Sequence, residues 1–250
     1  MTFKTASLSL VGHRKENQDR VAVLRRDDSL LLIVVDGMGG HSHGANAAQL
    51  TVDTIRHCFG NSRAAMLDPQ GFLTIALSLA HDAVVGLGAH LPLDQRPRAT
   101  CAVCVVQDNR SFWAHVGDSR IYQLRDGEVV ARTRDHSHIE LLLREGVIQE
   151  NQMSSHPMRN LVECCLGGDS PLPEGSVSGS RLLEPGDTLI VCTDGLWSGV
   201  DDFTLAAVAT DPTIDLDAAL EELAETAVAN SAPHSDNTSL CALRCADGTP

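Results

Sequence analysis

Short apolar runs rich in Val, Ile and Leu alternate with polar turns along most of the chain. Runs of this kind are typical of buried β-strands. They predict strands over residues 6–11, 20–24, 31–36, 99–107, 111–116, 119–125, 128–132, 189–194 and 238–243. Asp126 and Gly127, between two of these runs, predict a tight hairpin, so we expect the strands on either side to pair antiparallel.

Apolar residues three and four positions apart, or helix start signals, predict helices over residues 45–59, 68–83, 137–144, 201–209 and 216–228. The start signals are Asp68 followed by Pro69, and the capping-box pair Ser137 and Glu140. Helices come early and late in the chain, with most strands between them. This order predicts an α+β fold, a four-layer α-β-β-α sandwich in which helices cover two antiparallel sheets.

We predict a single domain over residues 1–250, because no linker rich in Pro, Gly or Ser and no long charge run divides the chain. The apolar content of 43% is typical of a globular protein, and the aromatic content of 3% predicts an aliphatic core. Residues 146–180 depart from the regular pattern. They are polar and irregular, and their number predicts a functional loop or flap.

The formal net charge of −14 argues against a nucleic-acid or anionic-membrane partner, because Lys and Arg drive such binding. We find no apolar stretch long enough to cross a bilayer and expect no signal peptide, so we predict a soluble cytoplasmic protein. Most of the eight cysteines lie in apolar runs, where a thiol acts as a small hydrophobe. Cys101 and Cys104 have CxxC spacing, but this odd offset points them to opposite faces of a strand, so we expect no zinc site.

Acidic residues stand at the ends of several predicted strands. Asp36 with Gly37, and Asp194, follow apolar runs; Asp118 follows a third run, and Asp236 precedes the last one. In an antiparallel sheet, the ends of some strands and the starts of others share one rim, so these carboxylates would meet there. Unpaired, they would repel one another, and such a cluster needs cations. One Asp-Gly pair more often marks a turn, but the repetition at strand ends predicts a metal site.

Seven motifs follow one another along the chain and together resemble the metal-dependent protein phosphatases (PPM, type 2C), a family of serine/threonine phosphatases, in their short bacterial form. The resemblance spans residues 14–237. The motifs are Arg14-x-x-Asn17-Gln18-Asp19, Asp36-Gly37-Met38-Gly39-Gly40-His41, Gly117-Asp118-Ser119-Arg120, Asp135-His136-Ser137, His156-Pro157-x-Arg159-Asn160, Thr193-Asp194-Gly195 and Asp236-Asn237.

The resemblance implies the same α-β-β-α fold and a centre of two Mn²⁺ or Mg²⁺ ions at one rim. It implies that Asp36 bridges the two ions and that the carbonyl group of Gly37 binds one of them. By the same resemblance, Asp194 and Asp236 bind the other ion, and Asp19 completes the shell directly or through a water. Oxygen ligands suit these hard ions, and a glycine without a Cβ lets its carbonyl group approach an ion closely.

The resemblance also implies a third, weaker ion held by Asp118 together with Asp194. Arg14 matches the arginine that binds the substrate phosphate, and its planar guanidinium can contact two phosphate oxygens. Met38 stands where eukaryotic relatives have a histidine proposed as the general acid. A metal-bound water and His41 are therefore both candidates for the proton donor, although His41 can equally cap the following helix.

The implied activity is hydrolysis of phosphoserine and phosphothreonine in proteins, by attack of a hydroxide that bridges the two ions. We expect a monomer that acts on phosphorylated proteins and opposes a serine/threonine kinase. Two other hypotheses are a non-catalytic scaffold with this fold, which should have lost Asp36, Asp194 or Asp236, and a hydrolase of small phosphate esters. All three aspartates are present. Activity on a phosphopeptide and on free phosphoserine would separate the remaining two hypotheses.

Overall fold

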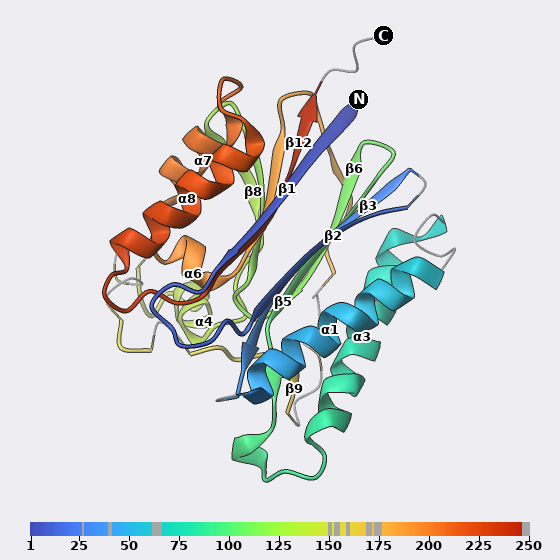
Figure 1. The fold of residues 1–250 in the computed structure, drawn as a ribbon, viewed down its shortest axis with the longest axis vertical. Coiled ribbons are helices and arrows are strands. Elements are labelled where there is room, and N and C mark those ends of the chain that lie inside the picture. The colour runs from blue at the N-terminus through green and yellow to red at the C-terminus, as the bar shows by residue number, and fades with distance from the viewer. Residues whose placement is uncertain are drawn as a thin grey trace.

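The computed structural model describes residues 1–26, 28–39, 42–61, 67–149, 152, 156–158, 161–168, 172 and 177–246. Two β-sheets pack face to face, and helices cover both outer faces (Figure 1). The predicted four-layer α-β-β-α sandwich is confirmed.

The first sheet has five strands, and every neighbouring pair is antiparallel. In sheet order the strands are β1 (Thr2–Leu10), β12 (Thr238–Ala246), β11 (Thr188–Cys192), β7 (Arg120–Arg125) and β8 (Glu128–Arg132). Its outer face is covered by α7 (Asp202–Thr210) and α8 (Leu216–Asn230), and the short helix α6 (Asp194–Trp197) follows β11 directly.

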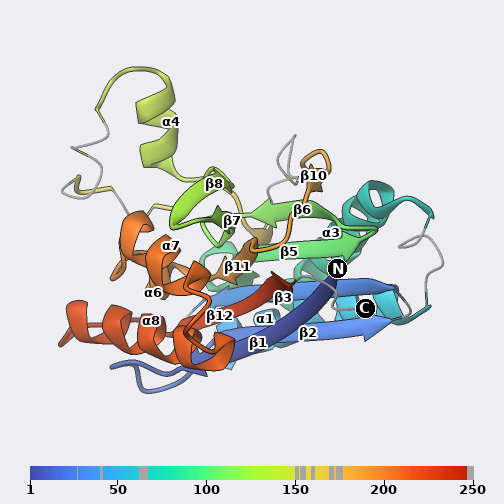
Figure 2. The same ribbon diagram turned by 90° about the horizontal axis from the view of Figure 1, so that it is seen from above.

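The second sheet has seven strands, all paired antiparallel. Its main path runs through β10 (Arg181–Leu182), β6 (Arg110–Val116), β5 (Cys101–Gln107), β3 (Ser29–Met38), β4 (Arg98–Ala99) and β9 (Leu166–Gly167), and β2 (Asp19–Arg26) pairs with β3. Two long helices cover its outer face, α1 (Ser42–Asn61) and α3 (Pro69–Gly88). Beyond the layers lie the 3₁₀ turn η1 (Leu93–Gln95) and α4 (His138–Arg144), which projects from the body of the sheets (Figure 2).

The core has three apolar layers, one between the sheets and one under each pair of helices. Strand β3 shows how the sequence builds them. Leu31 and Ile33 face α1 and α3, whereas the alternate residues Leu30 and Leu32 face the other sheet. Its unbroken apolar run is therefore what a strand buried on both faces requires.

Helix α3 corrects one expectation from the sequence. It is long and apolar enough to cross a membrane by length and composition. In the structure, however, one face packs against α1 and the second sheet, where Phe72, Leu73, Leu77 and Val84 are buried. A core helix of a folded domain has this character as well, so the finding is weak support for a membrane span.

Several local predictions are confirmed. Asp126 and Gly127 have φ values of 51° and 77°, which a tight two-residue hairpin turn requires. The carboxylate of Asp68 accepts a hydrogen bond from the Gly71 N–H, so it caps α3 as expected. Ser137 likewise accepts one from the Glu140 N–H at the start of α4.

Candidate metal centre

Five aspartates lie at one rim of the sandwich. Asp19 opens β2 and stands opposite Asp36 in the register of β2 with β3. Asp194 follows the end of β11, Asp236 precedes β12, and Asp118 lies in the turn between β6 and β7. Both sheets therefore contribute carboxylates to the rim, as the antiparallel pattern predicted.

The carboxylates are buried and near enough to repel one another. Burial raises the pKa of Asp36 well above its usual range, and repulsion by Asp194, Asp19 and Asp118 raises it further. Burial and repulsion by Asp118 and Asp236 do the same for the pKa of Asp194. Burial is also the main reason that the pKa of Asp19 and that of Asp118 each rise to about 6. Cations would remove this mutual repulsion.

A cleft of about 600 Å³ opens at this rim. Arg14, Asp36, Gly37 and Asp236 all line it, together with Met38. The side chain of Arg14 is 57% exposed, and its Nη2 donates to Oδ2 of Asp236 at 2.5 Å. Arg14 is thus held beside the carboxylates and remains open to solvent.

The loop that carries Arg14 is fixed by the residues just before β12. Asn237 accepts a hydrogen bond from the Gln18 N–H at 2.8 Å through Oδ1. Its Nδ2 donates to the carbonyl oxygens of Val11 and Glu16 at 2.9 and 3.0 Å. Asn237 therefore ties both ends of the loop to the start of β12. The sequence motif contained Asn237, but its role was not predicted.

Gly37 and Gly44 let β3 pass against the start of α1. A Cβ on Gly44 would lie 2.5 Å from the carbonyl oxygen of Gly37, and a Cβ on Gly37 would lie even closer to that of Gly44. A side chain at either position would separate the strand from the helix. This steric reason for Gly37 differs from the predicted one, and the need for Gly44 was not predicted because the two residues meet only in the folded chain.

Several polar groups fix the residues that carry the carboxylates, one through its carboxylate and two through their backbone carbonyl groups. The Thr193 hydroxyl donates to Oδ2 of Asp19 at 2.9 Å, and Trp197 Nε1 donates to the carbonyl oxygen of Asp118 at 3.0 Å. The Thr100 N–H donates to the carbonyl oxygen of Asp36 at 2.9 Å. Each contact orients a predicted ligand through a residue that had no predicted role.

Arg120 and Asp135 form a buried ion pair behind Asp118. Arg120 Nε and Nη2 donate to the two carboxylate oxygens at 2.8 and 2.7 Å, and the side chains are only 10% and 7% exposed. The guanidinium also stacks on Trp197, 3.7 Å from the ring centroid. Both residues belong to the sequence motifs, which marked them as candidates, but the ion pair between them was not predicted.

The sequence profile of the family described as protein phosphatase 2C matches residues 11–240. The chain belongs to this family.

Two relatives show how this chain compares in length with other family members. Protein phosphatase PhpP of Streptococcus pneumoniae is 28% identical over 238 residues, which cover 92% of each protein. Serine/threonine protein phosphatase PstP of Mycobacterium tuberculosis is 32% identical over 192 residues, which cover 77% of this chain and 36% of PstP. This chain therefore matches about a third of the PstP sequence.

Solved structures of phosphatases confirm the fold. The serine/threonine phosphatase of S. agalactiae superposes with a TM-score of 0.88 at 26% identity, over 98% of this chain and 100% of the other. The catalytic domain of PstP, solved in complex with two manganese ions, superposes with a TM-score of 0.83 at 28% identity. The match covers 98% of this chain and 99% of that one.

The residues at the rim of this phosphatase 2C chain suit hard divalent ions. They offer only oxygen donors, and their negative charges repel one another. Within the described ranges, no three His, Cys, Asp or Glu side chains converge closely enough to hold one ion by themselves. An open set of this kind suits Mg²⁺ and Mn²⁺, because Mg²⁺ usually keeps several waters and takes only one or two carboxylates.

The structure thus brings Asp19, Asp36, Asp118, Asp194 and Asp236 to one rim, and Arg14 and Gly37 line a cleft there together with Asp36 and Asp236. One predicted residue, His41, lies outside the described residues. Much of the predicted flap, residues 146–180, also lies outside them. Its described part at 161–164 runs against residues 136–138, with Ser137 and Val162 forming a β-bridge.

Proposed function

We propose that this chain is a metal-dependent phosphatase that hydrolyses phosphoserine and phosphothreonine in proteins. One observation carries the proposal. Arg14, Asp36 and Asp236 line a single cleft, and burial, together with repulsion by carboxylates from both sheets, raises the pKa of Asp36. A cation-binding cluster beside an exposed guanidinium fits the hydrolysis of a phosphate ester. The names of the relatives support a protein substrate.

Two Mn²⁺ or Mg²⁺ ions would be held by Asp36, the carbonyl group of Gly37, Asp194 and Asp236, with Asp19 completing the set. When bound, such ions neutralise the phosphate charge and make a water nucleophilic at neutral pH. The structure supports this set because these residues lie at one rim and are oriented by their neighbours. Thr193, for example, fixes the carboxylate of Asp19.

Arg14 binds and orients the substrate phosphate in this proposal. Its guanidinium offers two parallel N–H groups to two phosphate oxygens, an arrangement that Lys cannot copy. The bond to Asp236 holds the side chain at the cleft before substrate arrives. The phosphorylated residue is thereby placed next to the carboxylate cluster.

Asp118 is proposed to hold a third ion together with Asp194. Met38 lines the cleft and has no proton to give. The proton of the leaving serine or threonine oxygen therefore has to come from another group, and His41 is the alternative candidate. The position of Asp118 at the same rim, with its carbonyl oxygen fixed by Trp197, supports the first choice.

We further propose that residues 1–250 form one phosphatase domain that acts in the cytoplasm as a monomer and opposes a serine/threonine kinase. The segment 146–180 serves as a flap that sets the choice of protein substrate. The continuous layers of the sandwich support a single domain, and the bacterial phosphatases among the relatives support a role opposite a kinase.

A phosphothreonine peptide tests the proposal. The purified protein should release phosphate with Mn²⁺ or Mg²⁺ and stop in EDTA, and Asp36→Asn should lower turnover by several orders of magnitude. Asp82→Asn, an exposed acid on α3, is the matched control and should behave as the wild type. Full activity in EDTA would refute the proposal.

Arg14 has a test of its own. Arg14→Ala should mainly raise KM, and Arg14→Lys should restore only part of the loss, because a lysine cannot contact two oxygens in the same plane. Unaltered kinetics of Arg14→Ala on the phosphopeptide would show that the phosphate binds elsewhere.

A further inference from the structure

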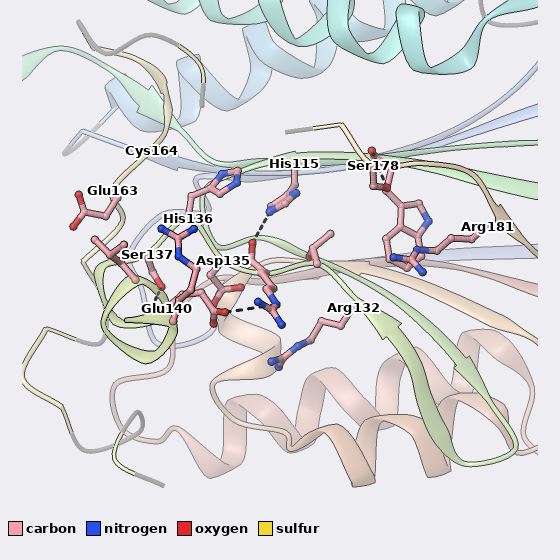
Figure 3. Close-up of a pocket in the computed structure, with 15 residues that line it drawn as sticks. His115, Arg132, Asp135, His136, Ser137, Glu140, Glu163, Cys164, Ser178 and Arg181 are labelled. Carbon is pink, nitrogen blue, oxygen red and sulfur yellow. Dashed lines mark hydrogen bonds and ion pairs between the residues drawn. The ribbon is translucent and has the colours of Figure 1, made fainter. Parts of the chain in front are cut away.

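A second cavity, of about 670 Å³, lies apart from the metal cleft (Figure 3). None of the proposed metal ligands lines it. Its wall includes Trp113 and His115 from β6, and in Figure 3 Arg181 lies at one end while Glu163 and Cys164 lie at the other. The volume is within the usual range of ligand-binding sites.

The cavity is rich in positive charge although the protein is acidic. Four arginines line it, Arg132, Arg134, Arg144 and Arg181, out of 19 basic residues in a chain of net charge −14. An even spread of basic residues over the surface would not place so many around one cavity. A ligand that fits this lining carries negative charge.

The acidic residues nearby compensate only two of the four arginines. Asp135 is bound by Arg120, and Glu163 lies 2.6 Å from Nδ1 of His138. Glu140 forms a long ion pair with Arg134 at 3.9 Å, and Asp202, outside the lining, pairs with Arg132 at 3.3 Å. Arg144 and Arg181 are therefore the two arginines of the lining that no described acid compensates.

Two of the arginines lack a polar partner. Among the described residues, neither the Arg144 nor the Arg181 side chain forms a hydrogen bond or an ion pair. Arg181 stacks over Trp113, 4.6 Å from the ring centroid, and its Nε is buried without an acceptor. The stacking orients the guanidinium at the cavity wall, where a ligand oxygen would give its terminal N–H groups the acceptor that no described residue supplies.

The floor of the cavity is connected to the metal centre. His136, which stacks on His115 with 4.4 Å between ring centroids, accepts a hydrogen bond from the Gly117 N–H through Nδ1. Gly117 precedes Asp118 in the chain. The described part of the predicted flap, at 161–164, lies on the same side, since Glu163 N–H donates to the carbonyl oxygen of His136. A ligand in the cavity would therefore sit close to both.

We infer that this cavity binds the carboxylate or phosphoryl groups of acidic residues that lie near the phosphorylated serine or threonine of the protein substrate, and that Arg144 and Arg181 each contact such a group. The inference rests on the proposed function and specifies which substrates it favours. Planar guanidinium groups suit both kinds of oxyanion. A free small anion has the same chemistry and is the other source to be tested.

The test compares two phosphothreonine peptides with Mn²⁺, one flanked by Asp and Glu and one by Asn and Gln. The wild type should have a kcat/KM about tenfold higher on the acidic peptide, the effect of one charge-assisted hydrogen bond of ordinary strength. Arg181→Gln and Arg144→Gln should each bring this ratio toward one, and Arg144→Glu should reverse it. The ratio of kcat/KM on the two peptides is unaffected by a general change in turnover. Arg144 is exposed, so its variants should fold.

Arg110→Gln is the matched control. Arg110 lies at the start of β6, near the cavity but outside its lining, where it donates to the Ser180 hydroxyl at 2.9 Å. It loses the same charge as the other variants and should keep the wild-type ratio. A ratio that fell equally in this variant would reveal a general effect of net charge and overturn the inference.

Titration with inorganic sulfate, followed by tryptophan fluorescence, examines the second source. Sulfate binding that disappears in Arg181→Gln, without any peptide preference, would assign the cavity to a free anion. If neither the peptide ratio nor sulfate binding depends on Arg144 or Arg181, the inference is wrong. Failure to hydrolyse either peptide would instead refute the proposed function, so the two failures are distinguishable.

Discussion

The buried pair of Arg120 and Asp135 permits a sharp prediction for Asp135→Asn. The substitution removes the charge that compensates a guanidinium with only 10% of its side chain exposed. Breaking a buried ion pair costs about 3–5 kcal/mol, and because Asn keeps one acceptor oxygen we expect about 3 kcal/mol. For a chain of this length, that corresponds to a fall in Tm of roughly 6–12 °C.

Turnover should fall as well. The Arg120 guanidinium stacks on Trp197, and Trp197 in turn donates to the carbonyl oxygen of Asp118. Once Asp135 no longer fixes Arg120, this chain of contacts loosens at the proposed third-ion ligand. The free energy of unfolding should be measured by urea titration in EDTA, so that metal binding does not contribute, and turnover on a phosphopeptide with Mn²⁺.

Asp187→Asn is the matched control because it breaks a similar pair at the opposite end of β7. Asp187 is fully buried and bonded to Arg125, whose side chain is 27% exposed. It should lose comparable stability and keep its turnover. If Asp135→Asn lost less than about 1 kcal/mol, or if both variants lost turnover equally, the proposed link from Arg120 to Asp118 would be wrong.

Three further predictions concern the packing at the rim, the third ion and the pH dependence of stability. Gly44→Ala should abolish turnover, since its Cβ would lie 2.5 Å from the Gly37 carbonyl oxygen. Gly60 lies in open space on the same helix, so Gly60→Ala should keep turnover and stabilise the folded protein by up to about 1 kcal/mol. Equal effects of the two substitutions in thermal melts and activity assays would refute this. Asp118→Ala should keep two tightly bound ions in a calorimetric titration but lose most turnover, and loss of a tight site would place it in the core instead. Burial, and then repulsion by His115, lower the folded pKa of His136 to about 4, below its usual value of 6.5. The unfolded chain therefore binds the proton more readily, so this contribution is complete above pH 6.5 and is lost as the pH falls toward 4. In His136→Gln the dependence of unfolding free energy on pH should be flatter across this window, and an unchanged slope would contradict the assignment.

The sequence predicted the larger elements because each has a strong local signal. Strand β3, for example, is an unbroken apolar run, and α3 begins at a capping Asp68 followed by Pro69. The short strands β4, β9 and β10 were missed, as was α6. A two-residue strand exists only because a partner strand lies beside it, so its own residues carry almost no signal.

In the candidate site, too, features with a local signal were predicted and features that depend on distant residues were not. Residue types at strand ends predicted which aspartates share the rim, because antiparallel pairing fixes where strand ends lie. The supporting contacts were not predictable in this way. Thr193 and Asp19 are 174 positions apart and Asn237 and Gln18 are 219 apart, and only the packing of the two sheets brings each pair together.

The position of β12 has a consequence for folding during translation. This strand follows every other described element in the chain, yet it lies inside the first sheet, between β1 and β11. Until it emerges, β1 has no partner in that sheet, and Asp236 and Asn237 cannot yet fix the Arg14 loop. A nascent chain that has already exposed Asp19, Asp36 and Asp194 therefore still lacks part of the proposed site, and we expect activity to begin only after β12 has been translated.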